Sequence, residues 1–150
     1  MLPLPILHED EFLVAIDKPA GMIVHAGRDP EGPEWIAMKR LRDQLGRQVY
    51  PVHRLDRPTS GVLLFALDAR TNGLAQKSFE LRKVVKTYHA IVCGIPPEVW
   101  SCETPLSATA EEPMKDARTD FRRLKRSVVS GDPALELSLI EALPRTGRFH

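Results

Sequence analysis

The residues best suited to chemistry stand together at 53–61, in the order His53-Arg54-Leu55-Asp56-Arg57-Pro58-Thr59-Ser60-Gly61. One carboxylate, Asp56, stands between two arginines, and the apolar run 62–67 follows directly. Packing so much charge beside a core gives a fold little stability. An active site benefits from it, because a rigid strand can hold a carboxylate while adjacent cations keep it ionised. We therefore take Asp56 as the first candidate for a catalytic group.

A structural role explains the same pattern about equally well when only the residue types are considered. Asp56 could be the salt-bridge partner of Arg54 or of Arg57. In an extended segment, Arg54 and Asp56 point to the same side because side chains alternate along a strand. The pattern alone therefore leaves catalysis and an ion pair open.

Two other constellations carry less weight. His53, Asp56 and Ser60 have the composition of a hydrolase triad, but the chain contains no Gly-x-Ser-x-Gly elbow. The spacing of His25, His53 and His89 fits no metal motif, and the two cysteines form no CxxC pair. We predict neither a hydrolase nor a metal site.

The first half of the chain must supply the elements that position Asp56. Short strands are expected at 6–7, 12–16 and 22–25, with a Lys-Pro-Ala-Gly turn at 18–21. Apolar residues recur at helical spacing from Trp35 to Leu45, and Gly46 follows as a stop. The continuous apolar run 62–67 predicts a strand buried on both faces.

In the second half, Asp68 is expected to cap a helix that runs to about residue 82. Strands are predicted at 87–92, 119–124 and 135–139, while 101–118 is polar and weakly patterned. Tyr88 falls in the first of these strands, where the pattern alone favours a simple core residue. These elements predict an α+β domain around a mixed, mainly antiparallel central sheet flanked by helices and loops.

Composition places few limits on function. The 150 residues suffice for one domain, and a formal charge of +1 neither demands nor excludes nucleic acid. Local basic clusters could meet phosphates, or could simply be solvated faces: 39–42, 82–86 and 122–126. Two cysteines, no leader pattern and no long apolar run predict a cytoplasmic protein without a membrane span.

The 53–61 segment also resembles the catalytic signature of the RluA-type pseudouridine synthases, which isomerise uridine in RNA to its C-glycoside. The resemblance covers most of the chain: 6–25 is similar to the family's opening strands and Lys-Pro-x-Gly turn, and 86–94 to its Lys-x-Tyr strand. Residues 144–150 resemble the start of its late Thr-Gly-Arg-x-His-Gln motif. The fold implied is the family's catalytic core, in a single domain over residues 1–150.

The resemblance implies a role for each site residue. Asp56 becomes the essential catalytic group, and Tyr88 is the second catalytic residue, which lines the uracil pocket and stacks on the base or takes part in proton transfer at C5. Arg54 fills the space left by the flipped base, and Thr59 and Ser60 shape the turn. The implied RNA-binding or base-flipping residues are, in full, His53, Arg54, Arg57, Thr59, Ser60, Arg145 and Arg148.

The partners follow from the same resemblance. The isomerisation needs no redox step and no energy input, so no cofactor is implied. RNA is the implied partner, and 57–64 is most similar to the TruC type, which acts on a uridine in the acceptor stem of tRNA; tRNA is therefore expected rather than ribosomal RNA, and a monomer is expected.

The ends of the printed sequence bear on two alternatives. No S4-like domain precedes the core, and the sequence stops at His150, before the motif's final arginine, which pairs with the catalytic carboxylate in the family. We therefore expect an incomplete catalytic domain. An impaired fragment that only binds RNA, or a product that does not fold stably, are the competing interpretations.

Overall fold

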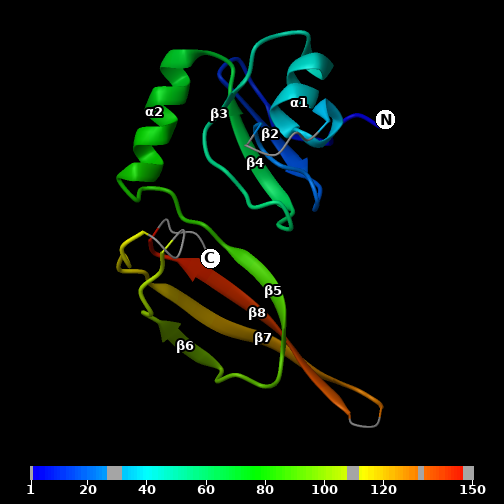
Figure 1. Cartoon of the computed structure of the whole chain (residues 1–150), viewed down its shortest axis with the longest axis vertical. Coiled ribbons are helices and arrows are strands. Elements are labelled where there is room, and N and C mark those ends of the chain that lie inside the picture. Colours follow the sequence, from blue (N-terminus) through cyan, green and yellow to red (C-terminus); the bar gives the residue numbers. More distant parts are fainter. Residues whose placement is uncertain (1, 27–31, 108–111, 132–133, 147–150) are drawn as a thin grey trace. The chain divides into compact units, whose positions relative to one another are not determined.

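The computed structural model describes residues 2–26, 32–107, 112–131 and 134–146. The chain divides into two compact units, Met1–Lys83 and Val84–His150, each built around its own four-stranded sheet (Figure 1). Every pairing between the named strands is antiparallel. Two helices accompany the two sheets, so the predicted α+β class is confirmed.

The sheet of the first unit has the strand order β1-β2-β4-β3. Its strands are β1 (Ile6–Glu9), β2 (Leu13–Lys18), β3 (Tyr50–Pro51) and β4 (Gly61–Ala66). The central pair, β2 and β4, runs in unbroken register from Leu13 opposite Ala66 to Lys18 opposite Gly61. The last residue of β2 therefore lies beside the first residue of β4, directly after the 53–60 segment.

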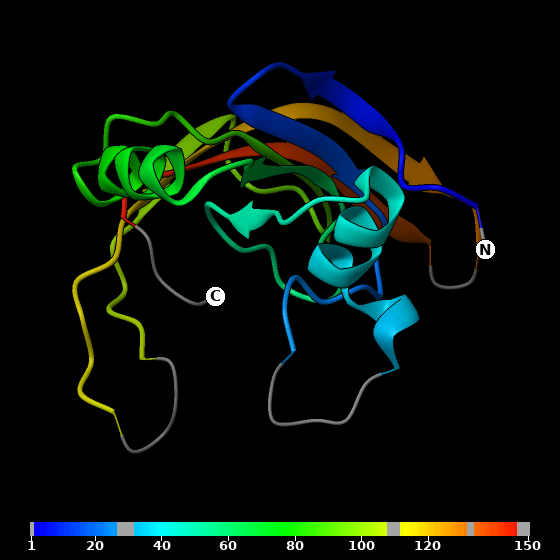
Figure 2. The ribbon, with the colours of Figure 1, turned by 90° about the horizontal axis from the view of Figure 1, so that it is seen from above.

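Helix α1 (Ala37–Leu45) follows the 3-10 turn η1 (Pro33–Trp35), and Figure 2 shows the two in succession. Gly46 ends the helix with a φ of 64°, a left-handed conformation that suits glycine. Among the residues that the structure describes, the largest fully buried apolar side chains all come from this unit: Val14, Ile16, Met22, Ile36, Leu41, Val49, Leu63 and Phe65. Their burial fixes β2, β4 and α1 as one rigid body.

Helix α2 (Ala69–Glu80) begins as the sequence predicts. The Asp68 side chain accepts the backbone N–H of Thr71 at 2.8 Å, and the Thr71 hydroxyl donates to its second oxygen at 2.6 Å. None of the helix residues is fully buried. Over the described residues, neither α1 nor α2 is long and apolar enough to cross a membrane.

The second unit has the strand order β5-β8-β7-β6. Its strands are β5 (Tyr88–Cys93), β6 (Val99–Cys102), β7 (Thr119–Val129) and β8 (Leu135–Pro144). β7 and β8 run side by side as the long central pair (Figure 1). The rings of Trp100 and Phe121 stack across β6 and β7 with their centroids 4.8 Å apart.

The structure corrects three expectations. Residues 22–25 do not form a strand, since only Ile23 makes a single bridge, to Ile36. β4 is not buried on both faces throughout, because Val62 is 62% exposed. The polar stretch after residue 101 begins inside β6. The predicted strands at 119–124 and 135–139 are confirmed, and both extend further.

Candidate active site

The segment between β3 and β4 carries the candidate carboxylate. Val52 and Leu55 are buried and anchor the segment, while the Asp56 side chain is 42% exposed. The backbone carbonyl of Asp56 accepts the N–H of Thr59 at 3.1 Å, which closes a tight turn before the strand. This combination holds the backbone of Asp56 in place and leaves its carboxylate accessible to a substrate.

Two cations lie near the carboxylate of Asp56. Nη2 of Arg54 is 3.8 Å from Oδ1, a loose ion pair between side chains that are both about half exposed. The second cation is Lys18, which is completely buried and whose charge interacts with that of Asp56. Burial lowers the pKa of Lys18, and the negative charge of Asp56 opposes that shift.

Lys18 also ties the two sequence motifs together. Its Nζ donates to the carbonyl oxygens of Met22 at 2.7 Å, of Pro19 at 3.0 Å and of Arg57 at 3.4 Å. The oxygen of Pro19 belongs to the Lys-Pro-Ala-Gly turn, that of Met22 to the residue directly after the turn, and that of Arg57 to the Asp56 segment. Three charge-assisted hydrogen bonds satisfy the buried ammonium group, so this lysine is a structural centre of the site.

Arg57 continues the same junction. Its Nε donates to the carbonyl of Gly21 at 3.2 Å, and its own carbonyl accepts the Gly21 N–H at 2.8 Å. The structure therefore places the Arg57 side chain on the neighbouring turn. Thr59 is half-buried and Ser60 is exposed, at the end of the turn that leads into β4.

His53 connects the segment to β4 and to α2. Its Nε2 accepts the backbone N–H of Leu64 at 3.2 Å, so Nδ1 carries the ring proton, 3.3 Å from the carbonyl of Arg54. The ring stacks on Phe79 of α2 at a centroid distance of 4.9 Å. His53 therefore has the contacts of a hydrogen-bonded histidine in the turn before a strand.

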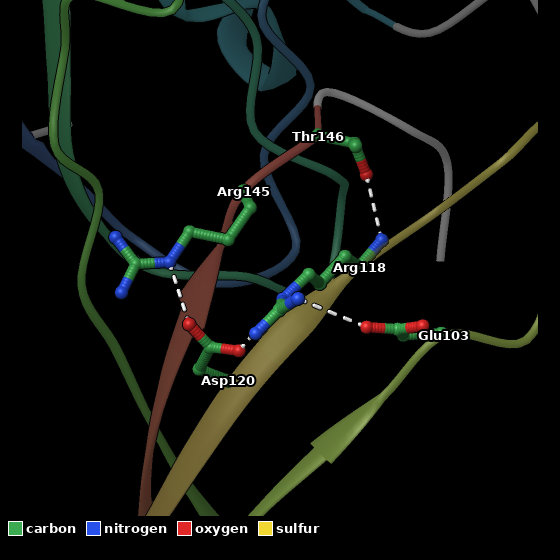
Figure 3. Close-up of polar contacts among 5 residues, drawn as sticks. All are labelled: Glu103, Arg118, Asp120, Arg145 and Thr146. Atoms are coloured by element: carbon green, nitrogen blue, oxygen red, sulfur yellow. Dashed lines mark hydrogen bonds and ion pairs between the residues drawn. The ribbon is translucent and has the colours of Figure 1, made fainter.

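The remaining predicted residues lie in the second unit. Tyr88 is half-buried at the start of β5, opposite Ala142 of β8. Arg145 follows β8, and its Nε donates to Oδ2 of Asp120 at 2.7 Å (Figure 3). Arg148 lies outside the described residues.

Two residues that contact the predicted site residues, one in each unit, were not singled out as functional from the sequence. Lys18 was interpreted only as part of a turn, and Asp120 only as a strand residue. For Lys18 a signal was present, since a lysine that ends an apolar strand and precedes Pro-x-Gly has little access to water. Asp120 had no such signal. Its partner Arg145 is 25 residues away in sequence, and Arg118 is two residues away, a spacing that is ordinary along a β-strand.

Comparison with known proteins identifies the family of the chain. Residues 12–150 match the model of a family described as RNA pseudouridylate synthase. The chain is 39% identical to tRNA pseudouridine synthase C of Pasteurella multocida over 163 aligned positions, with 99% of the chain and 67% of that protein covered. It is 42% identical to tRNA pseudouridine synthase C of Haemophilus influenzae, with 98% and 67% covered.

Solved structures give the same result. Human RNA Pseudouridylate Synthase Domain Containing 4 matches with a TM-score of 0.75 and 27% identity, over 97% of this chain and 60% of that one. The chain thus spans about two thirds of the length of these curated relatives and less of the solved structure. The resemblance seen in the motifs is confirmed, and the chain belongs to the RNA pseudouridylate synthase family.

Proposed function

We propose that this chain carries the catalytic core of an RNA pseudouridine synthase that acts on tRNA in the cytoplasm, with Asp56 as the catalytic group. The single observation that supports this most strongly is the setting of Asp56. Its carboxylate is 42% exposed, on a turn that Lys18, His53 and Arg57 fasten to buried strands. The tRNA substrate is inferred from the printed names of the relatives.

The reaction would move the uracil ring from an N-glycosidic to a C-glycosidic bond. The N1–C1′ bond breaks, the base turns, C5 joins C1′, the hydrogen on C5 leaves as a proton, and N1 takes up a proton. Asp56 can attack the sugar as a nucleophile or remove a proton from it as a base. Both routes need the ionised carboxylate.

The other site residues would bind and orient the nucleotide. Taking a base out of its stack costs a few kcal/mol, and a side chain that fills the vacated space offsets part of that cost. Arg54 is suited to this role because its long, charged side chain is 56% exposed and lies beside Asp56. Tyr88 supplies a ring for stacking on uracil, and Thr59 and Ser60 supply hydroxyl donors beside the turn.

The test uses bulk tRNA tritiated at uridine C5, because forming the C5–C1′ bond releases that hydrogen into water. The chain should release tritium, and Asp56→Asn should lower the rate on the order of a thousandfold or more, since it removes the reacting group. Asp43→Asn is the matched control, because Asp43 is an exposed α1 carboxylate paired with Arg42. Its rate should equal that of the wild type.

Two results would contradict the proposal. Equal tritium release by wild type and Asp56→Asn would remove Asp56 from the chemistry. Salt-dependent tRNA binding without any release, unchanged by Asp56→Asn, would identify the chain as an RNA-binding module instead of an enzyme.

A further inference from the structure

We propose that Asp120 is a positioning residue that holds Arg145 as a two-pronged group for one phosphate of the RNA backbone. The inference rests on the proposed function, because RNA supplies the phosphate. It concerns the second unit alone, where Glu103, Arg118, Asp120 and Arg145 form one network of ion pairs (Figure 3).

The geometry of the Asp120–Arg145 pair leaves the two terminal nitrogens of the arginine available. Arg145 donates to Oδ2 of Asp120 through Nε, at 2.7 Å. Its two terminal nitrogens carry four further N–H donors, and the side chain as a whole is 54% exposed. A guanidinium group held by Nε presents these terminal donors in a fixed plane, which matches two oxygens of a phosphate.

The carboxylate of Asp120 is itself fixed. Its other oxygen, Oδ1, accepts Nε of Arg118 at 3.1 Å, and Nη1 of Arg118 donates to Glu103 at 3.0 Å. The Asp120 side chain is only 25% exposed. An arginine held against such an acceptor loses less side-chain entropy on binding than a free one, so its contact with phosphate gains affinity.

The backbone fixes the same corner. The carbonyl of Arg118 accepts the N–H of Arg145 at 2.9 Å, and the N–H of Arg118 donates to the hydroxyl of Thr146 at 3.1 Å. Figure 3 shows these residues gathered at the adjoining ends of β7 and β8. Arg145 is therefore held at its backbone and at its guanidinium group.

The charges of the network decide how the idea can be tested. Two arginines and two carboxylates cancel, so excess positive charge does not explain an affinity for phosphate here. If charge alone mattered, removing either carboxylate would strengthen RNA binding, because one repulsion disappears. If position matters, removing the carboxylate that holds Arg145 must weaken binding.

The experiment compares Asp120→Asn with Glu103→Gln in tRNA binding, measured by fluorescence anisotropy over a series of salt concentrations. Both variants remove one negative charge from the same network, but only Asp120 contacts Arg145. Asp120→Asn should weaken tRNA binding about tenfold, and Glu103→Gln should leave it unchanged or tighter. Arg145→Ala should reduce the salt slope by about one, as expected for one lost phosphate contact.

Arg145→Lys keeps the positive charge and can still pair with Asp120, so it tests the fork without breaking the network. It should weaken binding about as much as Asp120→Asn, because a lysine offers no pair of parallel donors. A thermal melt of each variant shows whether the second unit is still folded.

Three results would overturn the inference. Tighter or unchanged binding by Asp120→Asn would show that charge, not position, decides affinity. Full tRNA affinity in Arg145→Lys would show that the paired donors of the guanidinium group are not needed. The inference alone would be rejected if the wild type isomerises uridine but Arg145→Ala changes neither the affinity for tRNA nor its salt slope. A wild type that neither binds nor isomerises tRNA would reject the proposed function as well.

Discussion

Gly21 and Arg57 are joined by two hydrogen bonds that run in opposite directions. The N–H of Gly21 donates to the carbonyl of Arg57 at 2.8 Å, and Nε of Arg57 donates back to the carbonyl of Gly21 at 3.2 Å. The Lys-Pro-Ala-Gly turn and the Asp56 segment, 35 residues apart in sequence, are thereby one structural unit. A change in the turn should consequently affect the conformation of the Asp56 segment.

Gly21→Ala should destabilise the first unit, although nothing lies within 4 Å of the added Cβ. Gly21 has a φ of +86°, where a Cβ introduces strain of about 1 kcal/mol or more. Gly73→Ala is the matched control, because Gly73 lies within α2 and its Cβ would also meet open space. It should stabilise by about 0.4–1 kcal/mol. Urea unfolding measures both, and equal effects of the two substitutions would refute the argument from backbone conformation.

Lys18→Met should lower both activity and stability. The methionine fills the same buried space but takes the ammonium donor from three carbonyl oxygens, of which that of Arg57 keeps the Gly21 N–H, and it removes a cation near Asp56. Misplacing a reacting group by a small distance costs about 10²-fold in rate, while the lost contacts cost about 1–3 kcal/mol. Tritium release and urea unfolding are compared with Lys77→Met, an exposed change on α2. Unaltered release by Lys18→Met would exclude a role in holding Asp56.

The lowered pKa of Lys18 also predicts an alkaline pH dependence. Because its pKa in the folded state lies below the usual 10.5, the unfolded chain binds more protons between those two values. The stability of the wild type relative to Lys18→Met should therefore rise as the pH increases through that interval towards 10.5. Urea midpoints of both proteins at several alkaline pH values measure the difference. A difference that shrinks as the pH rises would mean that the ammonium form is favoured by folding.

His53→Ala should destabilise the first unit by about 2–3 kcal/mol. It leaves the Leu64 N–H without its acceptor and removes the ring that stacks on Phe79. His8→Ala is the control, since His8 is 62% exposed and its contact with Asp10, at 3.1 Å, lies at the surface. Its effect should stay within about 0.5 kcal/mol. Thermal melts of the two variants measure the difference in stability. A His53→Ala protein as stable as the His8→Ala protein would show that the His53 ring has no structural role.

Asp120 should contribute to stability above its usual pKa and lose that contribution in acid. The Arg145 hydrogen bond, followed by the contact with Arg118, holds the pKa of Asp120 below 3.8. Stability linked to this group is therefore complete above pH 3.8 and disappears as the pH falls through the lower folded-state value. The advantage of wild type over Asp120→Asn in melting temperature should shrink in that range. An advantage that stays constant down to pH 2 (about the limit of such melts) would show that the carboxylate is not preferentially ionised in the folded protein.

Local signals explain what the sequence predicted well. Gly46 and Asp68 each act within one helical turn, so the end of α1 and the start of α2 were predictable from a few neighbouring residues. β6 was missed because it has only four residues. Only one of them, Trp100, is half-buried, so the segment has no strong alternation of buried and exposed residues. The added length of β7 and β8 comes from pairing with each other, which sequence windows do not register.

The candidate site divides in the same way. Asp56 was found because its motif is contiguous. The function of Lys18 depends on a carbonyl 39 residues away, and the Asp120 contact with Arg145 spans 25 residues. Long-range hydrogen bonds of this kind follow from tertiary packing, and no local pattern encodes them.

Each sheet is assembled from one uninterrupted stretch of chain, residues 6–66 for the first and 88–144 for the second. During synthesis, a nascent polypeptide that has emerged as far as Lys83 already contains the named strands and helices of the first unit, which carries Asp56. Domains generally fold as units from the N-terminal side on the ribosome, at a translation rate of about 5–20 residues per second. The strand that bears Tyr88 pairs with β8, whose synthesis ends only at Pro144, several seconds later at this rate. The carboxylate and its buried lysine can therefore be in place before the Tyr88 strand has its partner.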